Sequence, residues 1–206
     1  MKTKNFYWLI SGITLLGVLA LAALGGVSWW LSQRSADKPF AVTIDPPKPL
    51  EDFTLTTGDG ERHALNEYRG KVILLFFGYT HCPDICPLTL TNIQSAMQKL
   101  GPAANDVQVI MITVDPERDT PAHMAEFVHA FNPRFLGLSG TPQEIADIAK
   151  TYGIYYAQGE PDADGNYLVE HYVGVLTFDK QGYLRMIFPF GVTGDQFAQA
   201  LQPLLH

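Results

Sequence analysis

The sequence predicts a mixed α/β domain preceded by a single transmembrane helix. Two observations predict this organisation. A long uncharged apolar stretch lies near the amino terminus, and after residue 50 apolar runs typical of buried strands alternate with capped helical segments. The expected segments are a short cytoplasmic amino terminus at residues 1–5, a membrane anchor at 6–31, a linker at 32–49 and the domain at 50–206.

The amino-terminal stretch has the features of a membrane anchor. No charged residue lies between Lys4 and Arg34, and about twenty apolar residues at about 1.5 Å each match a hydrocarbon layer of about 30 Å. Aromatic residues flank both ends, and Lys2 and Lys4 on the short side predict a cytoplasmic amino terminus with the remainder exported. A cleaved signal peptide, with a small-residue site at 20–22, stays the alternative, although the stretch is longer than a usual signal core.

The linker and the charge balance limit the partners of the exported part. Residues 32–49 contain four prolines and no apolar periodicity, and proline-rich chain is extended and semi-rigid. The whole chain has 14 basic and 21 acidic residues; because two lysines precede the anchor, the exported part has 12 basic and 21 acidic residues, a formal charge of −9. This charge argues against binding to nucleic acid and against docking on anionic lipid.

Strands are expected where apolar runs are bounded by turn residues. The run at 72–78 is apolar almost throughout, as in a strand that is buried on both faces. A turn at 58–60 indicates a short early hairpin, and a turn at 179–182 indicates a late one. The expected strands lie at 52–55, 72–78, 107–114, 135–138, 169–178 and 183–188.

Helices are expected between these strands, and capping residues mark their starts. Thr120 precedes a proline, and Thr141 is followed three residues later by Glu144, which is the pattern of a capping box. The expected helices lie at 88–100, at 121–131, after Thr141 and at 193–205. The order βαβαβα followed by ββα is that of a thioredoxin-like fold with an added amino-terminal hairpin.

The two cysteines of the chain, Cys82 and Cys86, follow the buried strand at 72–78 directly. Open α/β sheets place their sites at such carboxyl ends of strands, and two close thiols either form a redox-active pair or hold a soft metal. Both cysteines precede prolines, so both are expected in extended or turn conformation. Pro87 suits a first helical position, which makes Cys86 the expected N-cap, with a lowered thiol pKa.

Among the six histidines, His171 differs from the others in its setting. Alternation along the expected strand places it on the same face as Val169 and Val173, and a polar ring on an apolar face needs a hydrogen-bond partner or a metal. From the residues alone, a core histidine with a satisfied ring stays the more common explanation. His81, next to Cys82, is expected to face away from the thiols.

Three features of the chain resemble the Sco/SenC family. They are residues 77–87 (FGYTHCPDICP), residues 113–121 (TVDPERDTP) and a histidine about 85 residues after the second cysteine. Members of this family are membrane-anchored, thioredoxin-like copper proteins that take part in cytochrome c oxidase assembly. The resemblance covers the exported domain and the anchor.

The resemblance implies that Cys82, Cys86 and His171 are copper ligands and that Asp115 is an acid beside the site. One departure concerns the neighbours of the histidine: the family usually has an aspartate before it and a small hydroxyl residue after it. Here Glu170 and Tyr172 occupy these positions, and such neighbours affect ligand orientation and loop mobility.

The ligand types agree with one copper ion per domain. Two thiolates suit Cu(I), and an added imidazole gives a trigonal site that also holds Cu(II). Zinc, with a fourth ligand from Asp84, His81 or water, stays an alternative. Calcium is a poorer fit because the glycine in residues 162–166 is at the fourth position of the motif, not the sixth. Residues 159–165 are expected to form a flexible acidic loop that lets His171 approach or leave the thiols.

Two functions stay open. The first is a copper chaperone that helps to metallate the CuA centre of a cytochrome c oxidase subunit; the second is an exported enzyme, a thiol-disulfide oxidoreductase that reduces partner cysteines. A peroxiredoxin is a poorer option because Thr80 lies two residues before Cys82, and not three. An oxidised cysteine pair cannot bind copper, so a thiol reductant is an expected partner. The expected location is the inner membrane of a bacterium, with the domain in the periplasm or outside the cell.

Overall fold

The computed structural model describes residues 25–26 and 40–205, and residues Phe40–His206 form one compact unit. The predicted cytoplasmic segment at 1–5 and nearly all of the predicted anchor at 6–31 lie outside the described residues. Within the described ranges, no helix has the length and apolar character needed to cross a membrane.

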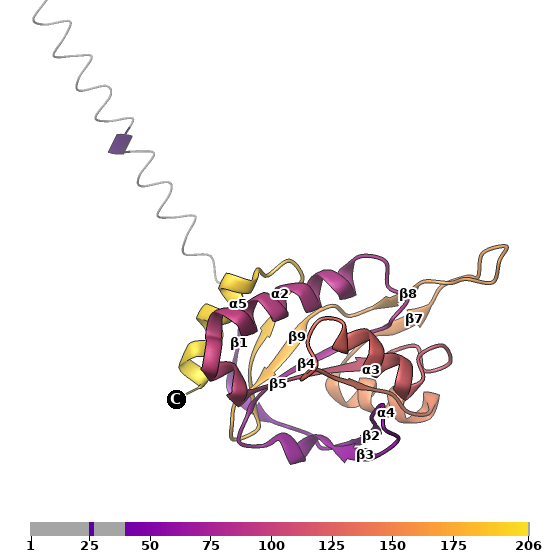
Figure 1. Ribbon diagram of the computed structural model, residues 1–206, viewed down its shortest axis with the longest axis horizontal. Helices are drawn as coiled ribbons and strands as arrows, with labels where there is room; N and C mark the ends of the chain where they lie inside the picture. The colour runs from indigo at the N-terminus through magenta and orange to yellow at the C-terminus, as the bar shows by residue number, and fades with distance from the viewer. Residues whose placement is uncertain (1–24, 27–39, 206) are drawn as a thin grey trace, which may run out of the picture. The chain divides into compact units, whose positions relative to one another are not determined.

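A mixed sheet of six strands forms the centre of the domain (Figure 1), and its strand order is β1-β10-β9-β4-β5-β6. β4, β5 and β6 run parallel, whereas β9 is antiparallel to β4 and β10 is antiparallel to β9. All residues of β4 and β5 are buried, as in strands covered on both faces. The strands are β1 (Val42–Pro49), β4 (Val72–Gly78), β5 (Val107–Thr113), β6 (Leu136–Leu138), β9 (Val175–Phe178) and β10 (Tyr183–Phe188).

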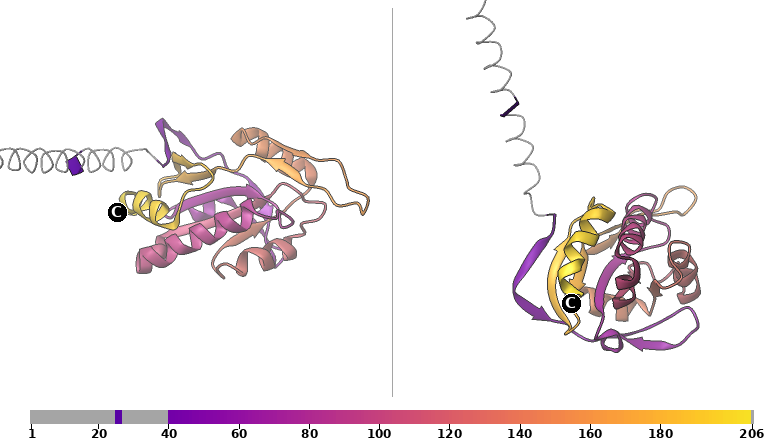
Figure 2. Two further views of the ribbon diagram at one scale, coloured as in Figure 1. Left: turned by 90° about the horizontal axis from the view of Figure 1, so that it is seen from above. Right: turned by 60° about the vertical axis from the view of Figure 1, so that its left-hand side comes forward.

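The helices cover this sheet and begin at the expected caps. α2 and α5 lie side by side (Figures 1 and 2), and α3 packs against β6. The side chains of Thr120 and Thr141 each accept a hydrogen bond from the backbone N–H three residues further on, and Glu144 completes the predicted capping box. The α-helices are α2 (Ile85–Leu100), α3 (Pro121–His129), α4 (Pro142–Tyr152) and α5 (Gly194–Leu201), and the 3-10 helices are η1 (Leu65–Tyr68), η2 (Gly101–Asp106) and η3 (Gln202–Leu204).

The succession of elements confirms the predicted mixed α/β, thioredoxin-like architecture. β4-α2-β5-α3 supplies the parallel half of the sheet, and β9-β10-α5 supplies the antiparallel half. The added amino-terminal hairpin is present as β2 (Thr54–Thr56) and β3 (Arg62–Ala64), which pair antiparallel apart from the main sheet.

Part of the predicted linker is a strand. β1 (Val42–Pro49) pairs antiparallel with β10 at the edge of the main sheet, so the ordered domain begins before residue 50. Prolines are tolerated in an edge strand because one side of it needs no partner. The pairing with β10 is interrupted between Thr43 and Lys48, around the prolines that conceal this strand in the sequence.

The strand predicted at 169–178 is two strands in two different sheets. β8 (Val169–His171) pairs with β7 (Tyr156–Gln158) in a separate hairpin, and the main sheet resumes with β9 at Val175. A side chain at Gly174 would collide with the Tyr172 ring, which lies against this glycine. The interruption removes His171 from the central sheet and places it on a hairpin whose loop, residues 159–168, extends from the body of the domain (Figure 1).

Candidate metal centre

The two thiols lie where β4 ends and α2 begins. Cys82 is in the connecting loop and Cys86 is in the first turn of α2. The Sγ atom of Cys82 accepts a hydrogen bond of 3.4 Å from the backbone N–H of Cys86, one of the amides that a helix leaves free at its start. Asp84, the N-cap residue, makes no side-chain capping bond, so the Cys82 sulfur performs part of that role.

This arrangement corrects the predicted position of Cys86. α2 begins at Ile85 and not at residue 88, so Cys86 is helical and is neither extended nor the N-cap. The residue before a proline disfavours helical conformation without forbidding it. Pro87 falls in the first turn, where its missing N–H removes no helical hydrogen bond. The sulfur that faces the helix start therefore belongs to Cys82.

The two thiols differ in acidity, in the opposite sense to the prediction for Cys86. A hydrogen bond from the Cys86 thiol, helped by His171 and by the backbone N–H groups of Cys86 and Asp84, lowers the pKa of Cys82 to about 4, although burial acts against this shift. The same thiol hydrogen bond, burial and the negative charge on Cys82 raise the pKa of Cys86. Without metal, the pair is one thiolate and one thiol.

His171 presents one ring nitrogen to the thiols. Its Nδ1 lies 2.9 Å from the carbonyl oxygen of Tyr172, and because a carbonyl only accepts, Nδ1 is the donor of this hydrogen bond and Nε2 is the nitrogen that faces the thiols. Nε2 lies 3.8 Å from the Sγ atom of Cys86. The Tyr79 ring meets the imidazole edge-on, with ring centroids 5.7 Å apart.

The three predicted ligands converge. The Sγ atoms of Cys82 and Cys86 and a ring nitrogen of His171 all lie within 4.8 Å of one another. Metal bonds of about 2.3 Å to sulfur and about 2.0 Å to nitrogen, set about 120° apart, would separate sulfur from nitrogen by about 3.7 Å, close to the observed 3.8 Å. A surface pocket of about 280 Å³, which Asp84 also lines, adjoins the group.

The loop that carries Cys82 is anchored by Asp119, whose role the sequence pattern did not reveal. This carboxylate is completely buried and accepts hydrogen bonds from the Thr80 N–H at 3.0 Å, the Thr80 hydroxyl at 2.6 Å and the Thr113 hydroxyl at 2.7 Å. The sequence marks Asp119 only as a neighbour of the α3 cap. Its reach to Thr80 depends on β4 and β5 ending side by side.

His81 and Asp115 lie outside the thiol group. The His81 ring contacts the Thr80 hydroxyl and the His123 ring, which confirms that it faces away from Cys82 and Cys86. Asp115 makes its side-chain bonds to Arg118 at 2.5 Å and to Tyr167 at 2.8 Å. His81, Asp115 and Asp119 form a second group of potential metal-binding side chains, but the oxygens of both acids are already occupied by these protein donors.

Comparison with known proteins decides the family of this chain. The SCO1/SenC family model matches residues 41–206. The chain belongs to the SCO1/SenC family. A mitochondrial SCO2 homolog of Bos taurus is 37% identical over 197 residues, covering 91% of this chain and 73% of the relative.

Solved structures of SCO1/SenC proteins share the fold. The apo Sco1 protein of Thermus thermophilus has a TM-score of 0.74 and 38% identity, covering 81% of this chain and 97% of that one. ScoI of Bradyrhizobium japonicum, solved with copper bound, has a TM-score of 0.70 and 37% identity, covering 76% of this chain and 99% of that one. The predicted family and its fold are therefore confirmed, and a structure of the family holds copper.

Proposed function

We propose that this protein is a membrane-anchored copper chaperone, which holds one copper ion through Cys82, Cys86 and His171 and helps to metallate the CuA centre of cytochrome c oxidase. The observation that carries the proposal is the convergence of two sulfur atoms and one imidazole nitrogen within 4.8 Å. The copper-bound ScoI structure supports copper as the metal, and the resemblance of residues 77–87 and 113–121 to the Sco/SenC family supports a role in cytochrome c oxidase assembly.

The protonation states of the two thiols suit the uptake and release of copper. Cys82 already favours the thiolate, because its pKa is lowered to about 4, and Nε2 of His171 faces the thiols. The Cys86 thiol, with its raised pKa, must release a proton when the metal binds. The two thiolates are soft ligands that favour Cu(I), while the imidazole allows the same site to accommodate Cu(II).

Membrane attachment and location complete the proposal. The apolar stretch at 6–31 anchors the chain, residues 1–5 stay in the cytoplasm, and the domain lies in the periplasm or outside the cell. The relatives from Thermus thermophilus and Bradyrhizobium japonicum support a bacterial origin, and the apolar stretch supports an inner membrane as the location. The partners are the oxidase subunit that carries CuA and a reductant that keeps both cysteines as thiols.

A thiol-disulfide oxidoreductase is the second candidate, and the asymmetry of the thiols favours it. Cys82 reaches the surface slightly and has a lowered pKa, whereas Cys86 is completely buried. An attacking thiolate beside a protected thiol is the arrangement that disulfide exchange needs. Both activities use the same pair, and oxidation of the pair would release copper.

Copper retention separates the two candidates. The purified, reduced protein is loaded with copper, passed through gel filtration and analysed for metal and for free thiols. We expect about one copper per chain, loss of copper when the pair is oxidised, and transfer to a CuA-bearing oxidase fragment. Retention of copper while the thiol count falls to zero would refute the ligand assignment. Failure to retain copper in the reduced state would favour the oxidoreductase.

A further inference from the structure

We propose that Arg118 and Tyr167 form a latch that holds the β7–β8 hairpin against the body of the domain and so positions His171 toward the thiols. This inference deepens the proposed function, on which it rests, by naming the residues that set the geometry of the third ligand. Both are positioning residues, because each acts on the site through His171 and does not itself reach the sulfur atoms.

The need for a latch follows from the topology. In the described part of the chain β8 pairs with β7 and with no strand of the main sheet. A further bond from the Tyr172 N–H to the Tyr155 carbonyl stays within the same hairpin. The thiols belong to the β4–α2 junction, so backbone pairing does not determine the distance between His171 and the sulfur atoms. The chain connection from His171 to β9 at Val175 limits this distance, and side chains that bridge the hairpin and the body set it.

Arg118 makes three contacts that close this bridge. Its guanidinium lies 3.6 Å from the centroid of the Tyr167 ring and donates a hydrogen bond of 3.0 Å to the Tyr167 carbonyl. Its Nε donates at 2.5 Å to Asp115, and the Tyr167 hydroxyl donates at 2.8 Å to the same carboxylate. Arg118 and Asp115 belong to the body and Tyr167 to the hairpin, so the group ties the two parts together.

The latch lies close to the ligand along the chain. Tyr167 is two residues before Val169, where β8 begins. The Val169 N–H donates a hydrogen bond of 3.2 Å to the Tyr79 hydroxyl, and the Tyr79 ring meets the His171 imidazole edge-on. The guanidinium of Arg118 also lies 5.9 Å from the centroid of the Tyr79 ring. Tyr79 and Arg118, both in the body of the domain, therefore hold the hairpin at two adjacent points, Val169 and Tyr167.

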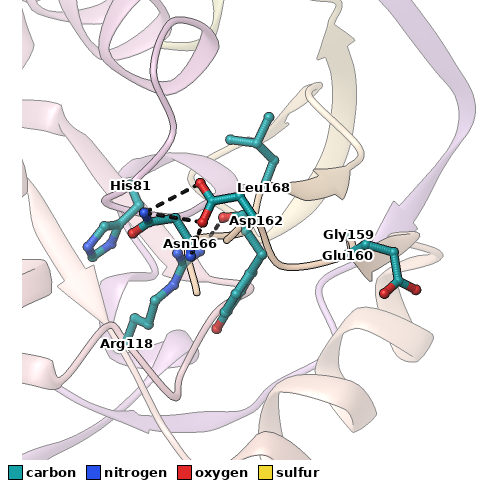
Figure 3. Close-up of a pocket in the computed structure, with 8 residues that line it drawn as sticks. His81, Arg118, Gly159, Glu160, Asp162, Asn166 and Leu168 are labelled. Atoms are coloured by element: carbon teal, nitrogen blue, oxygen red, sulfur yellow. Dashed lines mark hydrogen bonds between the residues drawn. The ribbon is translucent and has the colours of Figure 1, made fainter. Parts of the chain in front are cut away.

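Beyond the latch the hairpin loop is less closely held. A pocket of about 470 Å³ lies between body and loop; Figure 3 shows Arg118 among the residues that line it, together with Asp162 and Asn166 of the loop. The Asp162 carboxylate accepts hydrogen bonds from the backbone N–H groups of Asp164 and Asn166, so this turn is closed on itself. Because this pocket separates the loop from the body, the contacts of Arg118 and Tyr167 are the ones that position the hairpin.

The test compares Tyr167→Ala and Tyr167→Phe with a matched control, Tyr155→Ala. Tyr167→Ala removes the stacked ring and the hydroxyl, while Tyr167→Phe removes only the hydrogen bond to Asp115. Tyr155 is a tyrosine beside the same hairpin, 65% exposed and outside the latch. Thermal unfolding of each variant verifies that it folds. Hydrogen exchange of residues 167–172 is measured on the metal-free protein, and Cu(II) and Cu(I) affinities are measured on the reduced protein.

The expected result is faster exchange at residues 167–172 in Tyr167→Ala, together with a loss of Cu(II) affinity of about 10- to 100-fold. Cu(I) affinity changes much less, because both thiols stay in place. Tyr167→Phe shows a smaller effect of the same kind, and Tyr155→Ala matches the parent. Unchanged exchange in Tyr167→Ala, or faster exchange with unchanged Cu(II) affinity, overturns the latch.

Failure of the copper proposal gives a different result. If the parent protein holds no copper, the chaperone function is refuted and the exchange measurement alone decides the latch. Faster exchange in Tyr167→Ala than in Tyr155→Ala then supports the hold on the hairpin, and equal exchange refutes it. If Tyr167→Ala does not fold, Tyr167→Phe takes its place, since it keeps the ring that stacks on Arg118. Faster exchange in Tyr167→Phe than in Tyr155→Ala then supports the latch, and equal exchange refutes it.

Discussion

Cys82 and Cys86 have the same side chain and opposite environments. The Cys82 sulfur faces the start of α2 and accepts a hydrogen bond from the Cys86 N–H, so a negative charge there is stabilised. Cys86 is completely buried and lies beside that charge, so its proton is retained. This difference in acidity makes Cys82 ready to bind a metal or to attack a disulfide, and it keeps Cys86 protonated and shielded from solvent.

This difference predicts selective alkylation. In the reduced, metal-free protein at pH 6, iodoacetamide should modify Cys82 much faster than Cys86, because the pKa of Cys82 is lowered to about 4 and that of Cys86 is raised. The rate at Cys82 should fall only as the pH approaches 4, where the thiolate gains a proton. Peptide mass spectrometry measures both rates, and faster modification of Cys86 would contradict the assignment.

Replacing Asp119 should strongly reduce the stability of the fold, although Asp119 is not one of the proposed metal ligands. Asp119→Ala removes the acceptor of the Thr80 and Thr113 bonds and leaves buried donors unpaired, which should lower the free energy of unfolding by about 3 kcal/mol. Glu117→Ala, an exposed acid two residues earlier, is the control and should change it by less than about 0.5 kcal/mol. Urea denaturation measures both; equal effects would rule out an anchoring role for Asp119.

The sequence predicts the three candidate ligands but not their protonation. The spacing of Cys82 and Cys86 after a buried strand, together with the family resemblance, was enough to single them out with His171. The acidity depends on which sulfur faces the helix, and this depends on whether α2 begins at Ile85 or three residues later. Such a shift lies within the usual uncertainty of a helix boundary predicted from sequence, so the wrong thiol was expected to be the acidic one.

Helices and strands were predicted best where short-range signals are strong. Thr141 and Glu144 form the expected capping box of α4, because both partners lie within one turn. The strand at 169–178 was predicted as continuous because its composition is apolar; the break before β9 depends on how Tyr172 packs against Gly174. β1 was missed because prolines in an edge strand resemble those of a linker.

The capping box of α4 predicts a pH-dependent contribution to stability. The backbone N–H of Thr141, followed by contacts with Arg62 and the Thr141 hydroxyl, lowers the pKa of Glu144. A lowered pKa means that the contribution is complete above the ordinary glutamate pKa and is lost as the pH falls through the lower, folded-state value.

Glu144→Gln should therefore reduce the free energy of unfolding at pH 7 by about 0.5 kcal/mol, a modest amount because solvent screens this partly exposed site. The difference from the parent should shrink as the pH falls from 7 toward 3, because the parent side chain then begins to gain a proton as well. Urea denaturation at the two pH values measures this change. An equal difference at both would show that the charge of Glu144 contributes nothing.

Within the whole chain, the segment that contains the β7–β8 hairpin stands out by its negative charge. Residues 151–178 contain four acidic residues and no lysine or arginine. The only arginine between residues 100 and 133 is Arg118, whose charge is paired with Asp115. The segment that carries His171 is thus acidic, in keeping with the net charge of −7 of the whole chain. The overall order of elements was predictable because it follows from apolar runs, whereas the separate β7–β8 hairpin depends on contacts distant in sequence.

The proposed membrane anchor predicts how the protein fractionates in cells. If residues 6–31 span the inner membrane with the amino terminus inside, the protein fractionates with membranes and an external protease digests the domain in spheroplasts. A cytoplasmic protein serves as the control for intact membranes. Recovery of a soluble protein whose amino terminus begins shortly after residue 22 would instead indicate a cleaved signal peptide.

The most direct test of the copper site is X-ray absorption spectroscopy at the copper edge, applied to the loaded, reduced protein and to His171→Ala. We predict that the copper in the parent has two sulfur neighbours and one imidazole nitrogen. In His171→Ala the imidazole signal should disappear while both sulfur neighbours stay. An imidazole signal that persists in His171→Ala, or a parent spectrum with fewer than two sulfur neighbours, would contradict the assignment of Cys82, Cys86 and His171 as the copper ligands.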